Sequence, residues 1–227
     1  MVDMAINKGK LYIVATPIGN MADITLRALE TLKSVDFVLS EDTRVGKKLL
    51  DQYKINKPMI SYHHHSEAKK MREIESLLDN GKNIALITDA GTPGISDPGN
   101  LLIEQLIKND KEVIVAPIPG PCALISALSI SGFPTDKFIF LGFPPHKNKR
   151  QKFFKEVANA EQTVVIYESG HRILKCLGEL KEFLKPDKKI VICRELTKMF
   201  ETIYRGKIDE IMNNMKDERG EFVIIIN

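Results

Sequence analysis

Short apolar segments alternate with amphipathic segments through the first half of the chain, and this alternation constrains the fold more than any other feature. Strand character is concentrated at Lys10–Ala15, Phe37–Ser40, Met59–Ser61, Ile84–Thr88 and Val113–Ala116. Helical periodicity fills the intervals, at Ile24–Ser34, Arg44–Tyr53, Glu67–Asn80 and Leu101–Lys108. Short apolar strands separated by amphipathic helices predict a mainly parallel sheet with helices on both faces.

The segment Ala116–Pro121 interrupts this pattern, because three prolines and a glycine within six residues disfavour both a helix and a central strand. We therefore predict two domains: an N-terminal α/β domain at 1–117, and a C-terminal α/β domain at 118–227. The second half is less regular. Its segments Lys189–Arg194 and Glu201–Arg205 are close enough for a hairpin, so we expect a mixed sheet there.

The composition is that of a globular protein, with 43% hydrophobic and 28% charged residues. No apolar run approaches the roughly 18 residues of a membrane span, and the first ten residues lack the apolar core of a signal peptide. The cysteines Cys122, Cys176 and Cys193 are too widely spaced for a metal site and are expected as buried thiols. These features predict a cytoplasmic protein without a membrane partner.

The histidine run His63–His65 suggests a metal site, but adjacent histidines in an extended segment point to opposite faces and rarely converge on one ion. Contacts to a substrate or to solvent are the favoured interpretation, and we predict no metal.

Eleven of the twelve residues from Thr88 to Gly99 are Thr, Ser, Asp, Ala, Gly or Pro, and this loop separates an expected strand from an expected helix. Open α/β sheets bind ligands in such loops at the carboxyl ends of their strands. An ordinary connection is the alternative, but connections are usually only two to six residues long. The loop Ala15–Thr25 follows another strand and is expected at the same sheet edge. It has neither dinucleotide-binding nor Walker spacing.

Polar clusters follow three further strands. Glu41 and Asp42 in Ser40–Arg44 are candidates for a base, for orienting a substrate or for capping the next helix, with Arg44 as an anion ligand. Tyr167–Arg172 and Arg194–Lys198 each place an acid, a hydroxyl and a base at a strand end. Ser169 with His171 lacks the spacing of a nucleophile elbow, so substrate contacts or capping are favoured over a hydrolase.

Positive charge gathers in the second half, where His146–Lys155 contains five lysines and arginines beside two phenylalanines. Such a cluster suits a nucleic-acid phosphate backbone. A solvated helix surface explains it equally well.

Taken together, the motifs resemble the small-subunit ribosomal RNA methyltransferase I family, a branch of the tetrapyrrole (precorrin) methylase superfamily. The resemblance spans residues 10 to 226 and rests on an ordered set of segments: Ala15–Asn20, Asp23–Thr25 with Arg27, Ser40–Arg44, Thr88–Gly99, Pro119–Pro121, Tyr167–Arg172 and Arg194–Lys198.

The resemblance implies S-adenosylmethionine as the cofactor and the 2′-hydroxyl of a cytidine in 16S rRNA of the small ribosomal subunit as the acceptor. It implies two α/β domains with a cleft between them, which holds the donor, and a homodimer. The implied donor-binding residues are Ile18, Asp89, Ala90, Thr92, Cys122, Ala123 and Tyr167. Many members continue past the position of Asn227 into a helical domain, so RNA contacts made there are not expected here.

A ribose hydroxyl is a weak nucleophile, so a positioned base is expected. The candidates for this one base are Glu41, Asp42, Glu168 and Glu195. The candidates for binding the RNA are Arg44, Arg172, Arg194, Lys198, Lys147, Lys149 and Arg150. Two alternatives remain open: a tetrapyrrole methylase with the same fold and donor, and a non-catalytic RNA-binding or ribosome-assembly protein.

Overall fold

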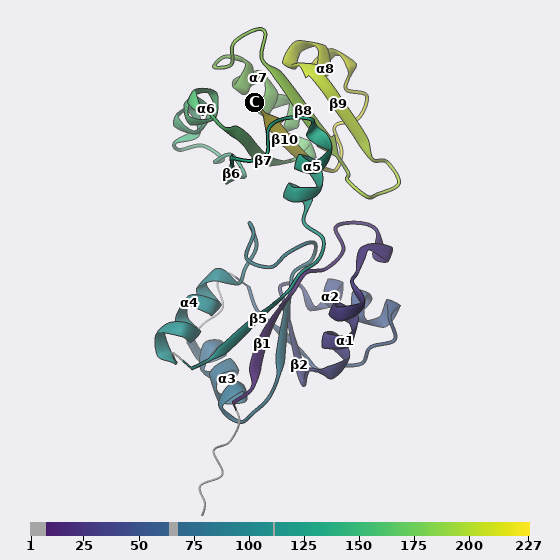
Figure 1. Cartoon of the computed structure of the whole chain (residues 1–227), viewed down its shortest axis with the longest axis vertical. Coiled ribbons are helices and arrows are strands. Elements are labelled where there is room, and N and C mark those ends of the chain that lie inside the picture. Colours follow the sequence, from purple (N-terminus) through teal and green to yellow (C-terminus); the bar gives the residue numbers. More distant parts are fainter. Residues whose placement is uncertain (1–7, 64–67, 111) are drawn as a thin grey trace, which may run out of the picture. The chain divides into compact units, whose positions relative to one another are not determined.

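The computed structural model describes residues 8–63, 68–110 and 112–227 (Figure 1). The chain forms two compact units, Met1–Cys122 and Ala123–Asn227, each built on its own five-stranded sheet. The expectation of two α/β domains is confirmed. The division falls between Cys122 and Ala123, whereas the sequence analysis placed it after residue 117.

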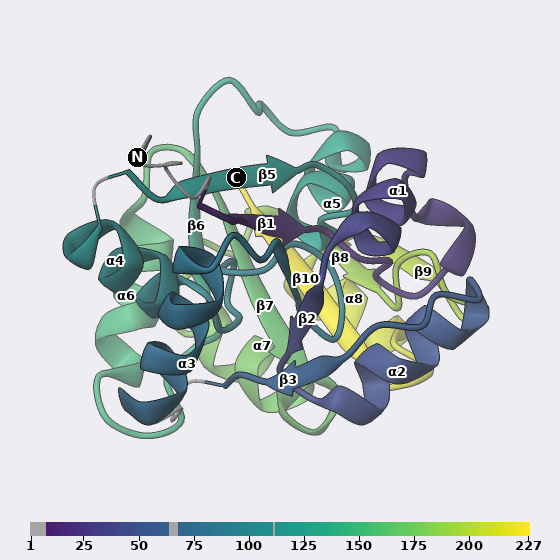
Figure 2. The same cartoon turned by 90° about the horizontal axis from the view of Figure 1, so that it is seen from below.

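The first unit is a parallel sheet between two layers of helices. Its elements are β1 (Lys10–Val14), η1 (Met21–Asp23), α1 (Leu26–Ser34), β2 (Phe37–Ser40), α2 (Thr43–Gln52), β3 (Met59–Ser61), α3 (Ala68–Asp79), β4 (Ile84–Ile87), α4 (Asn100–Asn109) and β5 (Ile114–Ile118). The strand order is β3-β2-β4-β1-β5, and every pair is parallel. Figures 1 and 2 show α1 and α2 on one side of the strands, with α3 and α4 on the other.

Strand β5 extends further than its prolines predict. Pro117 lies within β5 and pairs with Ile13, and Ile118 pairs with Val14. A central strand forms hydrogen bonds with a neighbour on each side, so a proline without an N–H would interrupt its pairing. Strand β5 is an edge strand with only β1 beside it, where the missing N–H is tolerated. The position of β5 in the sheet therefore explains why the proline-rich segment does not end the strand at Ala116.

The second unit contains a mixed sheet. Its elements are α5 (Ala123–Ser131), β6 (Phe138–Gly142), α6 (Arg150–Asn159), β7 (Thr163–Ser169), η2 (Gly170–Arg172), α7 (Ile173–Lys181), β8 (Lys189–Arg194), β9 (Thr202–Lys207), α8 (Ile208–Asn214) and β10 (Glu221–Ile226). The strand order is β6-β7-β10-β8-β9, in which only β6 and β7 are parallel. Strands β8 and β9 form an antiparallel hairpin.

The second unit has its main hydrophobic core on one face of this sheet. Phe154 of α6 and Leu177 of α7 pack there with residues of β7, β8 and β10. Helix α5 contacts β10 on the opposite face, where Val165 and Val223 are buried. The two faces of β7 therefore meet different helices.

Two of the three cysteines are buried inside the second unit. Cys176 and Cys193 are buried free thiols, and burial raises their pKa values to about 12 and about 11. Cys122 is half-buried. In the part of the chain that the structure describes, no helix has the length and apolar character to cross a membrane.

Candidate active site

In the first unit, the loop after β1 and the long loop after β4 are joined by backbone hydrogen bonds. The N–H of Thr16 donates to the Gly91 carbonyl at 2.8 Å, and the N–H of Gly91 donates to the Thr16 carbonyl at 3.1 Å. The Thr16 hydroxyl also donates to the Thr88 carbonyl at 3.2 Å. The two loops that the sequence analysis assigned to one sheet edge therefore touch.

A third segment, Pro119–Pro121, meets the long loop from the end of β5. The Thr92 hydroxyl donates to the Pro121 carbonyl at 3.1 Å. Gly91 has φ +83, and a Cβ at this position would lie 3.3 Å from Cγ2 of the buried Ile18. Gly91 therefore allows the three segments to approach one another closely, with Ile18 and Thr92 beside it.

Asp89 extends this surface toward the loop after β2. Its carboxylate accepts a long hydrogen bond of 3.4 Å from the Asp42 N–H. Although Asp89 is an exposed residue, its carboxylate is partly withdrawn from water, and this partial burial raises the pKa of the group. Ala90, the next residue, is exposed. Four of the expected donor-binding residues, Ile18, Asp89, Ala90 and Thr92, thus lie on adjoining loops of one unit.

The buried hydroxyl of Thr88 is a feature that the sequence analysis did not single out. Thr88 is only 3% exposed, and its Oγ1 has no hydrogen-bond partner among the described residues. Thr16 likewise stands out in the sequence only as part of the segment Ala15–Asn20. The sequence signal for both was their place at the ends of β1 and β4, where the polar loops begin.

Asp42 is held by the helix that follows it. As the N-cap of α2, it accepts the Arg44 N–H at 2.8 Å, and its two oxygens bind the Arg44 guanidinium at 2.6 to 3.2 Å. The hydrogen bonds from Arg44 lower the pKa of Asp42 to about 2, so it is a weak base. Glu41 is half-buried, and its carboxylate has no partner among the described residues.

In the second unit, Tyr167 is tied to the start of α5. Its hydroxyl accepts the Leu124 N–H at 3.0 Å, and its ring makes edge contacts with Phe140 and Phe143. Ala123 is the first residue of α5 and adjoins this bond. Two further candidates for the donor site, Ala123 and Tyr167, therefore lie close together. Cys122 ends the first unit, directly after Pro121.

Glu168 points to the other face of β7, because successive side chains of a strand alternate. It is 1% exposed, and its Oε1 lies 3.3 Å from Arg172 Nε and accepts the Ser169 N–H at 2.9 Å. Arg172 also donates to the Pro144 carbonyl at 2.5 Å. This buried ion pair anchors the segment that follows β6, and its carboxylate is closed to a substrate in this structure.

Arg194 is buried as well. Its guanidinium binds the carbonyls of Arg219 and Phe200 at 2.8 and 3.0 Å and lies 2.9 Å from Asp217 Oδ2. All of these partners are on loops beside β8. Because each of its three guanidinium nitrogens already has a partner and the side chain is buried, Arg194 holds these loops together and has little capacity for a phosphate.

Glu195 and Lys198 form a network with Glu221. The Lys198 ammonium donates to Glu195 at 2.8 Å and to Glu221 at 2.9 Å, and the Glu221 N–H donates to Glu195 at 2.9 Å. Burial alone would raise the pKa of Glu195, but these hydrogen bonds outweigh burial and lower it. Glu195 is therefore a poor candidate for a base at neutral pH.

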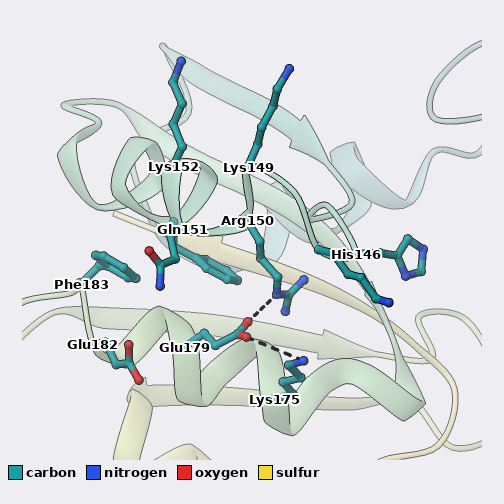
Figure 3. A pocket seen from close by; sticks show the side chains of 11 residues that line it. His146, Lys149, Arg150, Gln151, Lys152, Lys175, Glu179, Glu182 and Phe183 are labelled. Atoms are coloured by element: carbon teal, nitrogen blue, oxygen red, sulfur yellow. Dashed lines mark hydrogen bonds and ion pairs between the residues drawn. The ribbon is translucent and has the colours of Figure 1, made fainter.

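The basic segment divides into one buried arginine and several exposed lysines. Arg150 is 7% exposed, pairs with Glu179 at 2.5 Å and donates to the Pro145 carbonyl at 2.9 Å. Lys147 and Lys149 are exposed and line a pocket of about 660 Å³ beside Arg150 (Figure 3).

Metal ligands are not gathered in the described part of the chain, where no group of three or more His, Cys, Asp or Glu side chains is arranged to hold an ion. His63 is exposed, and His64 and His65 lie outside the described residues.

Known proteins similar to this chain include methyltransferases. The sequence model of the tetrapyrrole (corrin/porphyrin) methylases matches residues 10–212. Proteins called ribosomal RNA small subunit methyltransferase I align with nearly the whole chain. The one from Synechocystis sp. is 45% identical over 96% of this chain and 78% of its own length. The one from Thermotoga maritima is 42% identical over 96% of this chain and 98% of its own length. This chain belongs to the ribosomal RNA small subunit methyltransferase I family.

Solved structures show that the family's fold is the tetrapyrrole methylase fold. The methyltransferase CobJ superposes with a TM-score of 0.69 at 17% identity, over 96% of this chain and 94% of that chain. The cobalt precorrin-4 methyltransferase CbiF superposes with a TM-score of 0.68 at 18% identity, over the same shares. At these identities the likeness concerns the fold alone.

S-adenosylmethionine is the methyl donor of this family, and the loops of the first unit fit it. The Asp89 carboxylate provides acceptors for ribose hydroxyls or for an amino group. The absence of a side chain at Gly91 lets the loop that carries Asp89 approach Ile18 closely. The unpartnered Thr88 hydroxyl adds a polar atom at the start of the same loop. Carboxylate, glycine backbone and small side chains form a donor set that suits this cofactor.

Proposed function

We propose that this protein transfers a methyl group from S-adenosylmethionine to the 2′-hydroxyl of a cytidine ribose in 16S rRNA. The observation that carries the proposal is the hydrogen-bonded junction between Thr16 and Gly91, which gathers Ile18 and Asp89 on one loop surface. Family membership supports the small ribosomal subunit as the source of the acceptor.

The donor supplies an electrophilic methyl group on a sulfonium, so the protein's contribution is mainly to align the two reactants. We assign Ile18, Asp89, Ala90 and Thr92 to donor binding in the first unit. In the second unit, we assign Ala123, the first residue of α5, and Tyr167 of β7 to donor binding. We add Cys122, which directly precedes Ala123 in the sequence.

Among the four carboxylates considered as the base, Glu41 has the environment that suits this role best. Asp42 is bound to Arg44, Glu168 is buried with Arg172, and Glu195 is bound to Lys198. Glu41 is half-buried, and within the described ranges its carboxylate has no such partner. It adjoins Asp42, whose N–H contacts Asp89. We therefore propose that Glu41 accepts the proton of the ribose hydroxyl.

On the acceptor side, we propose that Arg44 and the exposed lysines of the basic segment contact RNA phosphates. The Arg44 side chain is 87% exposed, so it is accessible even though Asp42 binds part of its guanidinium. We assign Arg172 and Arg194 a positioning role, because their guanidinium groups are largely enclosed in the second unit. A homodimer and a cytoplasmic location, where ribosomes are assembled, belong to the same proposal.

The experiment is a methyl-transfer assay with labelled donor and small ribosomal subunits that lack the modification. The prediction is incorporation of label into 16S rRNA by the wild-type protein, and loss of incorporation in the Glu41→Gln variant. A uroporphyrinogen or precorrin substrate is tested in parallel. Transfer to the tetrapyrrole without transfer to rRNA would contradict the proposal. Binding of rRNA without binding of S-adenosylhomocysteine would instead indicate a non-catalytic RNA-binding protein.

A further inference from the structure

The second unit contains a positively charged pocket that none of the donor-binding residues lines. Its volume is about 660 Å³, and it lies beside the start of α6 and along α7 (Figure 3). Five cationic side chains line it against two carboxylates, those of Glu179 and Glu182. The cations are Lys147, Lys149, Arg150, Lys152 and Lys175. The excess of positive charge favours an anionic ligand.

The start of α6 adds backbone donors to this pocket. The N-cap residue Lys149 provides no side-chain hydrogen bond to the helix, so the first N–H groups of this ten-residue helix lack a side-chain cap. The N-terminal end of a helix also carries a partial positive charge. Arg150, Gln151 and Lys152, which form the first turn, all line the pocket.

Arg150 provides a second and independent indication of a ligand. Its Nε pairs with Glu179, and its Nη1 donates to the Pro145 carbonyl. The central carbon of its guanidinium lies 5.0 Å from the centre of the Phe154 ring. Its Nη2 is buried and has no hydrogen-bond partner among the described residues. A buried cationic N–H group without an acceptor is costly, so a ligand oxygen at this wall of the pocket would satisfy it.

We propose that this pocket binds a backbone phosphate of the RNA substrate. Lys149 and Lys152 extend to the same side of α6, away from Glu179 (Figure 3), an arrangement that suits a strand of successive phosphates. In this assignment, the lysines, the start of α6 and the Nη2 of Arg150 contact the phosphate, and the ion pair with Glu179 holds the Arg150 side chain in place. The inference rests on the proposed function, because it takes the anion to be part of an RNA.

The pocket binds a nucleotide other than the methylated one. Helices α6 and α7 cover the face of β7 that carries Glu168, whereas Tyr167 points to the face covered by α5. An RNA strand that reaches both faces has to pass around β6, which is the edge strand on that side. The phosphate in the pocket therefore belongs to a flanking nucleotide, and it contributes to binding and not to the chemical step.

The test compares two variants with equal charge changes. The first is Lys147→Gln/Lys149→Gln/Lys152→Gln, which removes three of the four exposed lysines that line the pocket. The matched control is Lys185→Gln/Lys189→Gln/Lys216→Gln, because these three lysines are exposed in the same unit, lie outside the basic segment and do not line the pocket. Thermal unfolding verifies that both variants are folded.

Affinity for 16S rRNA, measured without donor at several salt concentrations, is the primary readout. The pocket variant is expected to bind RNA roughly tenfold or more weakly, and each lost phosphate contact lowers the slope of log Kd against log salt by about 0.7 to 0.9. Its KM for small subunits rises while kcat and the affinity for S-adenosylhomocysteine stay at wild-type values. The control variant retains the wild-type slope.

Equal losses in the two variants would overturn the proposal, because they would reflect general charge. Unchanged RNA affinity in the pocket variant would also overturn it. If cytidine monophosphate binds the wild type and not the pocket variant, with RNA affinity unchanged, the pocket serves a free nucleotide instead. Methyl transfer by the wild type is measured separately. RNA binding through the pocket without any transfer would contradict the proposed function and leave the phosphate site standing.

Discussion

The main chains of Thr16 and Gly91 exchange two hydrogen bonds, of 2.8 and 3.1 Å, although the residues are 75 positions apart in the sequence. This pair fastens the loop after β1 to the loop after β4. Ile18 on one loop and Asp89 on the other consequently belong to one surface. The donor site that we propose depends on this junction more than on any single side chain.

Replacement of Gly91 by alanine is predicted to weaken donor binding. Gly91 has φ +83, and the added Cβ would lie 3.3 Å from Ile18, so the backbone or Ile18 has to move. The left-handed conformation itself costs roughly 1–2 kcal/mol for a residue with a Cβ. Calorimetric titration with S-adenosylhomocysteine checks the affinity. Gly178→Ala is the matched control, since nothing lies within 4 Å of a Cβ there. Equal affinities in the two variants would argue against the junction as a determinant of the site.

Asp89 is predicted to make donor binding pH-dependent. Partial burial raises its pKa above the usual value of 3.8, and the ionised form is the one that accepts two hydrogen bonds. Donor affinity should therefore rise as the pH increases through this raised pKa and stay constant above it. Asp89→Asn should bind the donor weakly at every pH, as measured by titration over a pH series.

Ionisation of Asp89 is predicted to lower the stability of the fold, although it favours donor binding. A carboxylate with a raised pKa in the folded state binds its proton more readily there than in the unfolded chain, so its ionised form opposes folding at neutral pH. Asp89→Asn should therefore leave the melting temperature unchanged or raise it. A lowered melting temperature with unchanged donor affinity would assign Asp89 a structural role.

Glu41→Gln is predicted to lower kcat by at least roughly 100-fold, the usual contribution of a positioned base. The affinity for S-adenosylhomocysteine should not change, because Glu41 acts on the acceptor hydroxyl. Asp42→Asn serves as the neighbouring comparison. It removes the charge that binds Arg44 but keeps a side-chain oxygen that can cap α2, so the melting temperature should change little and kcat should fall less than in the Glu41 variant. A larger loss of kcat for Asp42→Asn would move the base to Asp42.

Arg194→Gln is predicted to destabilise the second unit and not to affect RNA recognition directly. The change removes contacts to the Arg219 and Phe200 carbonyls and to Asp217. Each hydrogen bond to a charged group contributes about 1.5–3 kcal/mol to stability, so the midpoint of unfolding in urea should fall clearly. The KM of the folded variant for small subunits should equal that of the wild type. A raised KM without a loss of stability would restore Arg194 as an RNA ligand.

Local patterns predicted the strands, the helices and the polar loops, because apolar periodicity and glycine content are properties of short segments. They did not predict which residues of the loops touch. The bond between Thr92 and Pro121 and the contact of Gly91 with Ile18 depend on how the strands are ordered in the sheet. Pro117 shows the same limit, because its tolerance in β5 depends on the edge position of that strand.

The arginines show the same limit for side-chain burial. The sequence predicts that Arg150, Arg172 and Arg194 bind RNA, because Arg150 stands in the basic segment and the other two stand in polar clusters at strand ends. Their partners Glu179, Pro144 and Asp217 lie far from them in the sequence, so the burial of these side chains could not be read from local composition. The lysines of the basic segment stay exposed, in agreement with the tendency of long cationic side chains to keep their charge in water.

The most direct test of the account is nucleoside analysis of 16S rRNA from unmodified small subunits after incubation with the protein and S-adenosylmethionine. A 2′-O-methyl group prevents alkaline cleavage of the adjacent phosphodiester, because the 2′-oxygen no longer attacks the phosphate. The account predicts one cytidine that becomes resistant to alkali and yields 2′-O-methylcytidine on digestion, formed at least roughly 100-fold more slowly by Glu41→Gln. Methylation on a base, or on a ribose other than that of cytidine, would contradict it.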